Sequence, residues 1–291
     1  EEIHMKKSKL FGGLVLTASL FLAACGNGGT TADSSAAESS STVSAEPTTV
    51  KIGLVSESAV EIWEAVAERL EDENIDLEIV KFTDYNQPNI ALDNGELDLN
   101  AFQHVAFLEN YNANNDADLT PIGFTFVSPL GIYSDKYADY SEIQDGDTIA
   151  IPNDVTNGGR ALLLLQAIDL ITLDNAAGTA PTVNDIIENP KNLNIEELDA
   201  AQLPRSLEDA GAAVINTNFA VDAGLVPTED ALYLDTDNIQ EVLDIYKNVV
   251  AARAEDVDNE VYKKVVAAYQ TEETKTLIAE TTADTDIPAW D

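Results

Sequence analysis

The chain has 291 residues, of which 53 are Asp or Glu and only 15 are Lys or Arg, so its formal net charge is −38. So acidic a protein repels nucleic acid and anionic lipid headgroups, and we expect neither as a partner. Its single cysteine, Cys25, leaves no internal disulfide and no thiolate metal site, so the fold must depend on a hydrophobic core.

The N-terminal part has the anatomy of an export signal followed by a tether. Residues 1–4 precede Met5, which we expect to be the native start, so they are expected to be an added remnant. Residues 5–24 combine three lysines with a short apolar run that ends in small residues directly before Cys25. This pattern is typical of a lipoprotein signal, in which the cysteine is lipidated; an ordinary secretory signal with an incidental cysteine is the alternative. Residues 26–48 are rich in Ser, Thr, Ala and Glu, and are expected to be a disordered tether.

The acidic residues are spread along the chain, which indicates a solvated surface rather than a site. Without residues 1–24, whose two Glu and three Lys sum to +1, the net charge is −39. Repulsion among these charges predicts a domain that gains stability as salt screens them. Asp235 and Asp237 resemble the start of a calcium loop, but the central Gly and the terminal Glu are missing, so we expect no bound metal.

From residue 50 onward, strand-like and helix-like segments alternate. Short apolar runs predict strands, and apolar residues at helical spacing predict helices between them. Such alternation is typical of layered sheets, so we expect an α/β fold. The predicted strands cover residues 50–55, 77–82, 97–101, 122–126, 130–133, 148–151, 193–198, 212–216 and 246–252. The predicted helices are one from Ser58 to Glu73, a short one at Ile90–Leu92, 161–171, 182–188, one that starts at Leu203, and 259–279.

Two α/β cycles follow one another, and a helical tail ends the sequence. We expect residues 49–127 and 250–291 to form one lobe, and residues 128–249 to form the other. A cleft between two lobes is a common location for a ligand pocket.

Aromatic and amide side chains follow two neighbouring predicted strands. Tyr85 comes shortly after the second strand, and Phe102, Gln103 and His104 come directly after the third. Ligands of open α/β sheets bind beyond the carboxyl ends of strands, so these residues are candidates for a pocket. Ordinary core packing is their alternative role.

A second set of candidates lies near the starts of later helices. Arg160 follows an Asn-Gly-Gly sequence that begins at Asn157, at a junction where backbone N–H groups favour an anion. Its guanidinium can hold a carboxylate through two parallel hydrogen bonds, and pairing with an internal Asp or Glu is the alternative. Asn216 and Asn218 end an apolar strand, where their amides can accept from a ligand ammonium or simply form a turn.

Catalysis would need residues that the sequence does not offer. A nucleophile requires a positioned base, and His104 is the only histidine after the leader. Phosphate-binding and dinucleotide-binding glycine motifs are absent from the sequence. We therefore expect no enzyme activity, no cofactor and no metal.

Four long stretches carry a family resemblance. They are FTDYNQPNIAL, GELDLNAFQH, IPNDVTNGGRALLLLQ and LPRSLEDAGAAVINTNFAVDAGLVP, and they follow the cysteine motif in this order. Together they resemble the bacterial methionine-binding lipoproteins, the NlpA/MetQ family of ABC importer receptors. The resemblance covers essentially all of residues 49–291.

The resemblance implies a two-lobed periplasmic-binding-protein fold of the type II kind, with the ligand cleft between lobes that close on the ligand. It implies L-methionine or a close analogue as the ligand, handed to an ABC permease and its ATPase subunits. It also implies a monomer held at the extracytoplasmic face of the cell membrane by a lipid such as palmitate on Cys25, and the long tether favours a Gram-positive source. A methionine-containing dipeptide or another small amino-acid ligand is the alternative within this class, and an adhesive or enzymatic surface lipoprotein is the alternative outside it.

The residue patterns and the resemblance together predict eight ligand contacts: Tyr85, Phe102, Gln103, His104, Asn157, Arg160, Asn216 and Asn218. The family roles place the α-carboxylate on Arg160 with help from Asn157, and the amino-acid backbone on Asn216. The aromatic residues and His104 would surround the thioether, because sulfur contacts aromatic rings favourably. We expect Arg160→Ala to abolish binding with little effect on folding.

Overall fold

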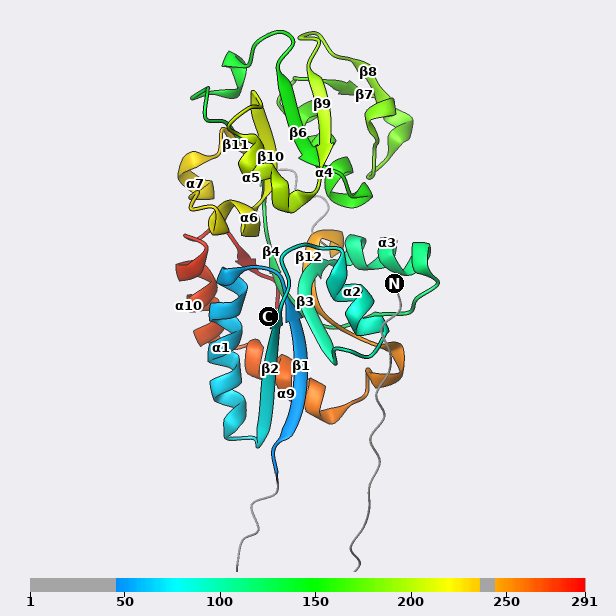
Figure 1. Ribbon diagram of the computed structural model, residues 1–291, viewed down its shortest axis with the longest axis vertical. Helices are drawn as coiled ribbons and strands as arrows, with labels where there is room; N and C mark the ends of the chain where they lie inside the picture. The colour runs from blue at the N-terminus through cyan, green and yellow to red at the C-terminus, as the bar shows by residue number, and fades with distance from the viewer. Residues whose placement is uncertain (1–45, 236–243, 291) are drawn as a thin grey trace, which may run out of the picture. The chain divides into compact units, whose positions relative to one another are not determined.

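The structure is a computed structural model that describes residues 46–235 and 244–290 (Figure 1). Its strands form one six-stranded sheet, one five-stranded sheet and a small two-stranded sheet, with helices between the strands. The expected α/β class is confirmed. None of the helices in these two ranges combines the length and the apolar character that crossing a bilayer requires. Cys25 and residues 26–45 of the tether predicted over residues 26–48 lie outside the described residues, whereas Thr48, the last residue predicted for the tether, already begins a strand.

The six-stranded sheet has the strand order β13-β4-β12-β3-β1-β2. Strand β1 pairs in parallel with β2 and β3, whereas β12 runs antiparallel to both β3 and β4. The strands are β1 (Thr48–Leu54), β2 (Ile75–Lys81), β3 (Leu99–His104), β4 (Thr120–Val127), β12 (Lys247–Ala252) and β13 (Ile287–Pro288). Strand β3 therefore begins later than the sequence predicts and includes the three residues that were expected to follow it.

Helices flank the six-stranded sheet and build its core. Trp63 and Tyr269 stack with their ring centroids 4.7 Å apart, and both are almost fully buried. Burying a large apolar side chain stabilises a fold by about 1.5–3 kcal/mol, so this pair joins the first and last parts of the described chain firmly. The helices are α1 (Glu57–Glu71), α2 (Gln87–Asp93), α3 (Val105–Asn115), α9 (Glu260–Tyr269) and α10 (Glu272–Thr281).

The five-stranded sheet has the strand order β11-β5-β10-β6-β9. Strand β6 pairs in parallel with β9 and β10, and β5 runs antiparallel to β10 and β11. The elements of this region are β5 (Leu130–Tyr133), β6 (Thr148–Pro152), α4 (Val155–Ala167), β7 (Thr172–Leu173), β8 (Ile186–Glu188), β9 (Asn194–Leu198), α5 (Leu203–Ser206), β10 (Ala212–Asn216), α6 (Thr217–Asp222), α7 (Pro227–Asp230) and β11 (Tyr233–Leu234).

The chain passes between the two large sheets at two places. Ser128 and Pro129 connect β4 of the first sheet with β5 of the second. Strand β12 returns to the first sheet, where it lies between β3 and β4. It begins at Lys247, slightly before the lobe boundary expected at residue 250, and the exact lobe limits stay a prediction.

Three segments differ from the sequence-based prediction. Helix α3 is not predicted, because its apolar residues lack helical spacing and only Leu108 is buried. The segment 182–188 is a 3-10 turn, Val183–Asp185, followed by strand β8 rather than a helix. The C-terminal helical region divides into two helices, because Gln270 leaves the helical conformation and Thr271 caps the next helix.

Candidate functional site

A cavity lies where residues of both large sheets meet. Its empty space amounts to about 600 Å³, including the part open to solvent. All eight predicted ligand contacts line it. The lining residues are Val55, Ser56, Ala59, Tyr85, Ala101, Phe102, Gln103, His104, Phe107, Phe126, Ser128, Pro129, Asn157, Arg160, Asn216, Thr217, Asn218 and Asn248. The structure thus brings the predicted residues together, and their role in binding stays a prediction.

One side of the cavity is aromatic. The ring of Tyr85 lies 5.9 Å from that of Phe102, 5.9 Å from that of Phe107 and 4.9 Å from that of Phe219, measured between centroids. The Tyr85 hydroxyl donates to Asn218 Oδ1 at 2.5 Å. Burial raises the pKa of Tyr85 well above its ordinary value, so the phenol stays neutral. This side therefore offers an uncharged, largely apolar surface to a ligand side chain.

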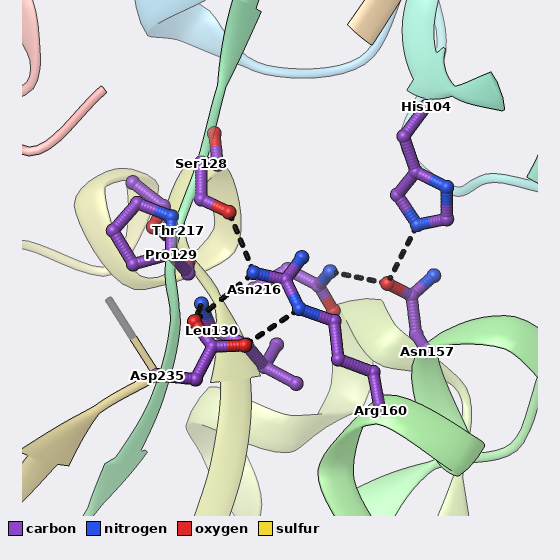
Figure 2. A network of polar contacts seen from close by, with 9 residues as sticks. All are labelled: His104, Ser128, Pro129, Leu130, Asn157, Arg160, Asn216, Thr217 and Asp235. Carbon is purple, nitrogen blue, oxygen red and sulfur yellow. Dashed lines mark hydrogen bonds and ion pairs between the residues drawn. The ribbon is translucent and has the colours of Figure 1, made fainter. Parts of the chain in front are cut away.

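His104 ends β3 and caps α3. Its Nδ1 accepts from the backbone N–H of Phe107 at 3.1 Å, so the ring proton must sit on Nε2. Nε2 lies 3.3 Å from Asn157 Oδ1, to which it then donates (Figure 2). Burial, and next the Arg160 guanidinium, lower the pKa of His104 to about 3. His104 is therefore a neutral connection between the two sheets, with both ring nitrogens already engaged.

Asn157 is oriented by the start of helix α4. The helix begins at Val155, so Asn157 and Arg160 lie inside its first two turns rather than before it. The carboxylate of Asp154 caps the helix and accepts from the Asn157 side-chain amide at 3.1 and 3.0 Å. Asn157 Oδ1 is thereby turned toward the cavity, where it accepts from His104 and, at 2.9 Å, from Asn216 Nδ2.

The carbonyl oxygen of the Asn216 side chain has no hydrogen-bond partner among the described residues, although it is buried. Its Nδ2 already donates to Asn157, which fixes the orientation of the amide (Figure 2). A buried polar atom without a partner is rare, because leaving it unsatisfied costs about 1–3 kcal/mol. This oxygen is therefore an acceptor that a ligand donor could satisfy.

Arg160 is 4 % exposed and forms an ion pair with Asp235, which is 3 % exposed. Its Nε donates to Asp235 Oδ2 at 2.7 Å, and its Nη2 donates to Asp235 Oδ1 at 3.0 Å and to the Ser128 carbonyl at 2.8 Å. The Tyr246 ring lies under the guanidinium, with its centroid 4.4 Å from Cζ. Of the two roles left open by the sequence, internal pairing is thus observed, and Arg160 lines the cavity as well.

Gln103 reaches the cavity, but its amide is used elsewhere. Asn89, Asn100 and Gln103 form a buried network in which Gln103 Oε1 accepts from Asn89 at 2.7 Å and Gln103 Nε2 donates to both Asn89 and Asn100. The Asn100 amide also donates to the carbonyl of Pro88. Gln103 therefore holds the end of β3 against the start of α2, which supports the wall of the cavity.

Phe107, Asn248 and Asp235 are among the contributors that were not predicted from the sequence. Phe107 extends the aromatic side, and Asn248 lies opposite His104 in the β12–β3 register, with Nδ2 donating to the Phe126 carbonyl at 3.2 Å. A polar residue within the apolar strand 246–252 was the available signal for Asn248. Asp235 was noted in the sequence only for its likeness to a calcium loop, and nothing indicated its pairing with Arg160, which is 75 positions away.

The donor set does not suggest a metal. Within the described ranges, no group of three or more His, Cys, Asp or Glu side chains is placed to hold a metal ion.

Comparisons with known proteins agree on one family. The profile of the family described as NlpA lipoprotein matches residues 50–290. The chain is 42 % identical over 231 residues to the D-methionine-binding lipoprotein MetQ of Escherichia coli (strain K12), covering 78 % of this chain and 83 % of that protein. It is 41 % identical over 270 residues to outer membrane lipoprotein 3 of Mannheimia haemolytica, covering 92 % and 94 % of the two chains.

Solved structures with the same fold cover most of this chain. A nutrient-binding protein from Burkholderia cenocepacia bound to methionine superposes with a TM-score of 0.79 at 42 % identity, covering 83 % of this chain and all of the other. The substrate-binding protein of a methionine transporter from Streptococcus pneumoniae superposes with a TM-score of 0.78 at 41 % identity, covering 83 % and 96 %. The predicted periplasmic-binding-protein fold is confirmed by these matches.

Proposed function

Since this chain belongs to the NlpA lipoprotein family, we propose that it is the extracytoplasmic receptor of an ABC importer and binds methionine in the cavity described above. The family resemblance predicted from the sequence is confirmed. Methionine is proposed as the ligand of this chain because the names or structures of its relatives specify methionine.

One observation carries the proposal: the cavity combines a fixed guanidinium, a free buried acceptor and an aromatic wall. The carboxylate of an amino acid would accept from Arg160, and its ammonium would donate to Asn216 Oδ1. The thioether would then lie against Tyr85 and Phe102, since sulfur–aromatic contacts are worth about 0.3–1.5 kcal/mol. The three groups thus match the three parts of methionine.

A binding role is favoured over catalysis by the state of His104. Its pKa of about 3 and its two hydrogen bonds leave no lone pair to take a proton from a substrate. The family names also describe lipoproteins and binding proteins rather than enzymes.

The remaining parts of the proposal concern closure, the anchor and the partners. The lobes would be residues 49–127 with 250–291, and residues 128–249, and they would close on the ligand. The hydrogen bond from Tyr85 to Asn218 and that from Asn218 to the Val55 carbonyl link the two sheets beside the cavity, as expected of a closed form. An ABC permease with its ATPase subunits would receive the ligand, and a lipid on Cys25 would hold the receptor to the membrane.

Titration calorimetry of the purified chain with L-methionine, D-methionine and a methionine-containing dipeptide tests the function. We expect micromolar or tighter binding of methionine, and the two titrations decide between the L enantiomer that the resemblance implies and the D enantiomer that the Escherichia coli relative is named for. Tighter binding of the dipeptide would replace methionine with the alternative ligand, and binding of none of the three would refute the proposal.

The anchor has its own test. We expect Cys25→Ser to move the protein from the membrane fraction to the soluble fraction of its native host, because no acyl chain can then be attached. Ser8→Ala, in the same leader, is the matched control and should leave the protein in the membrane fraction. Membrane retention of the Cys25→Ser protein would contradict lipidation at this cysteine.

A further inference from the structure

We propose that Asp235 is a positioning residue that sets both the pose and the effective charge of Arg160, so that the cavity selects ligands without net charge. The inference rests on the proposed function and deepens it, because it concerns the class of ligand that the same cavity admits.

Asp235 leaves Arg160 one orientation. The two parallel bonds to the carboxylate use Nε and Nη2, and the Ser128 carbonyl takes the second proton of Nη2 (Figure 2). Within the described part of the chain, Nη1 is the guanidinium nitrogen without a bonded acceptor. The Tyr246 ring covers one face of the same group. Arg160 can therefore offer a ligand carboxylate one nitrogen in one direction.

Asp235 itself is held by strand β5. Its backbone N–H donates to the carbonyl of Leu130 at 3.0 Å, and the Leu130 N–H donates to its Oδ1 at 2.7 Å. With the two bonds from Arg160, both carboxylate oxygens are satisfied. The carboxylate is thus fixed before any ligand arrives, which reduces the ordering that binding requires.

The formal charge among the lining side chains belongs to Arg160, and Asp235 lies directly behind it. Arg160 is the one lining residue with a formal charge, since His104 is neutral and the other lining side chains carry none. Asp235 cancels the charge of Arg160 from behind. A zwitterion enters such a cavity without adding net charge, whereas an anion or a cation would bury one uncompensated charge, which is costly.

A purely structural ion pair is the competing explanation, because buried pairs also occur without any role in binding. The two explanations differ in selectivity. A structural pair, when broken, weakens all ligands alike. A charge-setting pair, when neutralised on the Asp235 side, makes the cavity positive and so favours anions over cations.

The experiment uses methionine and two analogues that each lack one charged group. These are 4-(methylthio)butanoate, an anion, and 3-(methylthio)propylamine, a cation. Dissociation constants are measured by calorimetry or competition for the wild type, Asp235→Asn and the exposed control Glu229→Gln. In Asp235→Asn, we expect the affinity ratio of anion to cation to rise by about tenfold or more, as one full charge within a protein interior can produce.

The wild-type ratio should persist in Glu229→Gln and in Asp235→Glu, which keeps the charge. An unchanged ratio in Asp235→Asn, with both analogues weakened equally, would overturn the inference while leaving methionine binding intact. Failure of the wild type to bind methionine at all would instead refute the proposed function. If Asp235→Asn does not fold, the wild-type affinities alone still test the inference. An anionic analogue that binds the wild type as tightly as methionine does would exclude selection for ligands without net charge.

Discussion

Arg160 contacts Asp235 and is proposed to contact the ligand carboxylate as well. A substitution of Arg160 should therefore change both the stability of the fold and the affinity for the ligand. Its guanidinium is buried against Asp235 on one side and faces the cavity on the other. Removing one member of a buried ion pair leaves the other charge unpaired, which typically costs about 3–5 kcal/mol. The sequence-based expectation that Arg160→Ala would have little effect on folding therefore changes, because Asp235 would lose its partner.

For Arg160→Ala we now expect two effects together. Methionine affinity should fall by at least about a hundredfold, since a charge-assisted hydrogen bond and its orientation are lost. The free energy of unfolding should also fall by about 3–5 kcal/mol, because Asp235 stays buried without its partner. Calorimetric titration and urea denaturation measure the two effects. Arg205→Ala, outside the cavity lining, is the control; retained micromolar affinity in Arg160→Ala would remove Arg160 from the carboxylate role.

At the residue scale, the sequence predicted the cavity lining better than the contacts behind it. Tyr85, Arg160 and Asn216 stand out because their residue types and their places at element ends are local features. Asp235 and Asn89 do not, because each acts through a contact that only the folded chain creates. The neutral state of His104 also depends on burial, which one residue in a sequence cannot reveal.

At the scale of elements, the start of α4 links helix stability to the binding site. Asp154 caps the helix through the N–H of Asn157 and also holds the Asn157 side chain, whose oxygen joins His104 and Asn216. A capping residue of this kind contributes about 0.5–2 kcal/mol. Here the same carboxylate orients three side chains that line the cavity.

Asp154→Ala should therefore lower the affinity for methionine by more than the loss of helix stability alone would explain. We expect a loss of stability of about 1 kcal/mol from the missing cap, together with at least about a tenfold loss of methionine affinity, because one cavity hydrogen bond is worth about 1.5 kcal/mol. Asp139→Ala removes a comparable cap, on the 3-10 turn at Tyr140–Glu142, away from the cavity. Equal affinities in the two variants would show that Asp154 acts on the helix alone.

Asp286 is a buried acid that lies directly before β13 and contacts Ser128, which directly follows β4. Asp286 accepts from the Ser128 hydroxyl at 2.6 Å, beside the passage from one sheet to the other. Burial raises the pKa of Asp286 to about 7, against an ordinary value of 3.8. Between pH 3.8 and pH 7, Asp286 is therefore protonated in the folded chain and deprotonated in the unfolded chain. The contribution to stability is complete below pH 3.8 and is lost as the pH rises through 7.

Asp286→Asn imitates the protonated form, so its stability should not show this loss. Between pH 5 and pH 8.5 we expect the variant to gain a few kcal/mol relative to the wild type, since each pKa unit corresponds to about 1.4 kcal/mol. Urea denaturation across this range measures the difference, with the exposed Asp209→Asn as the control. A constant difference between Asp286→Asn and wild type at all pH values would mean that Asp286 does not titrate near neutrality.

Elements were predictable where the chain repeats a pattern. Helix α1 and strand β1 carry their apolar residues at the expected spacing, and the structure contains both. Helix α3 directly follows β3 and buries few side chains, so its apolar residues show no helical periodicity. The antiparallel entry of β12 between β3 and β4 was also beyond prediction, because strand direction depends on pairing across about 140 residues of chain.

At the scale of the whole molecule, charge is the dominant unexplained property. Asp and Glu number 53 against 15 Lys and Arg, so at least 38 carboxylates have no Lys or Arg of their own to pair with in the chain. Many pairs are also exposed, such as Lys51 with Glu78 and Lys264 with Glu73, and exposed pairs contribute about 0–1 kcal/mol each. Repulsion among the remaining carboxylates therefore opposes the compact state.

We expect the melting temperature to rise as sodium chloride is raised from about 10 to about 300 mM, because the Debye length falls from about 30 Å toward 6 Å over this range. Differential scanning calorimetry at fixed pH measures the rise. A variant with Glu61, Glu64 and Glu68 changed to Gln removes three exposed charges from one face of α1 and should show a smaller rise. Screening also weakens the attractive surface pairs, so the sign of the change reports which effect is larger. An unchanged or falling melting temperature would mean that the attractive pairs balance the repulsion. The acidic surface would then not lower the stability of the fold.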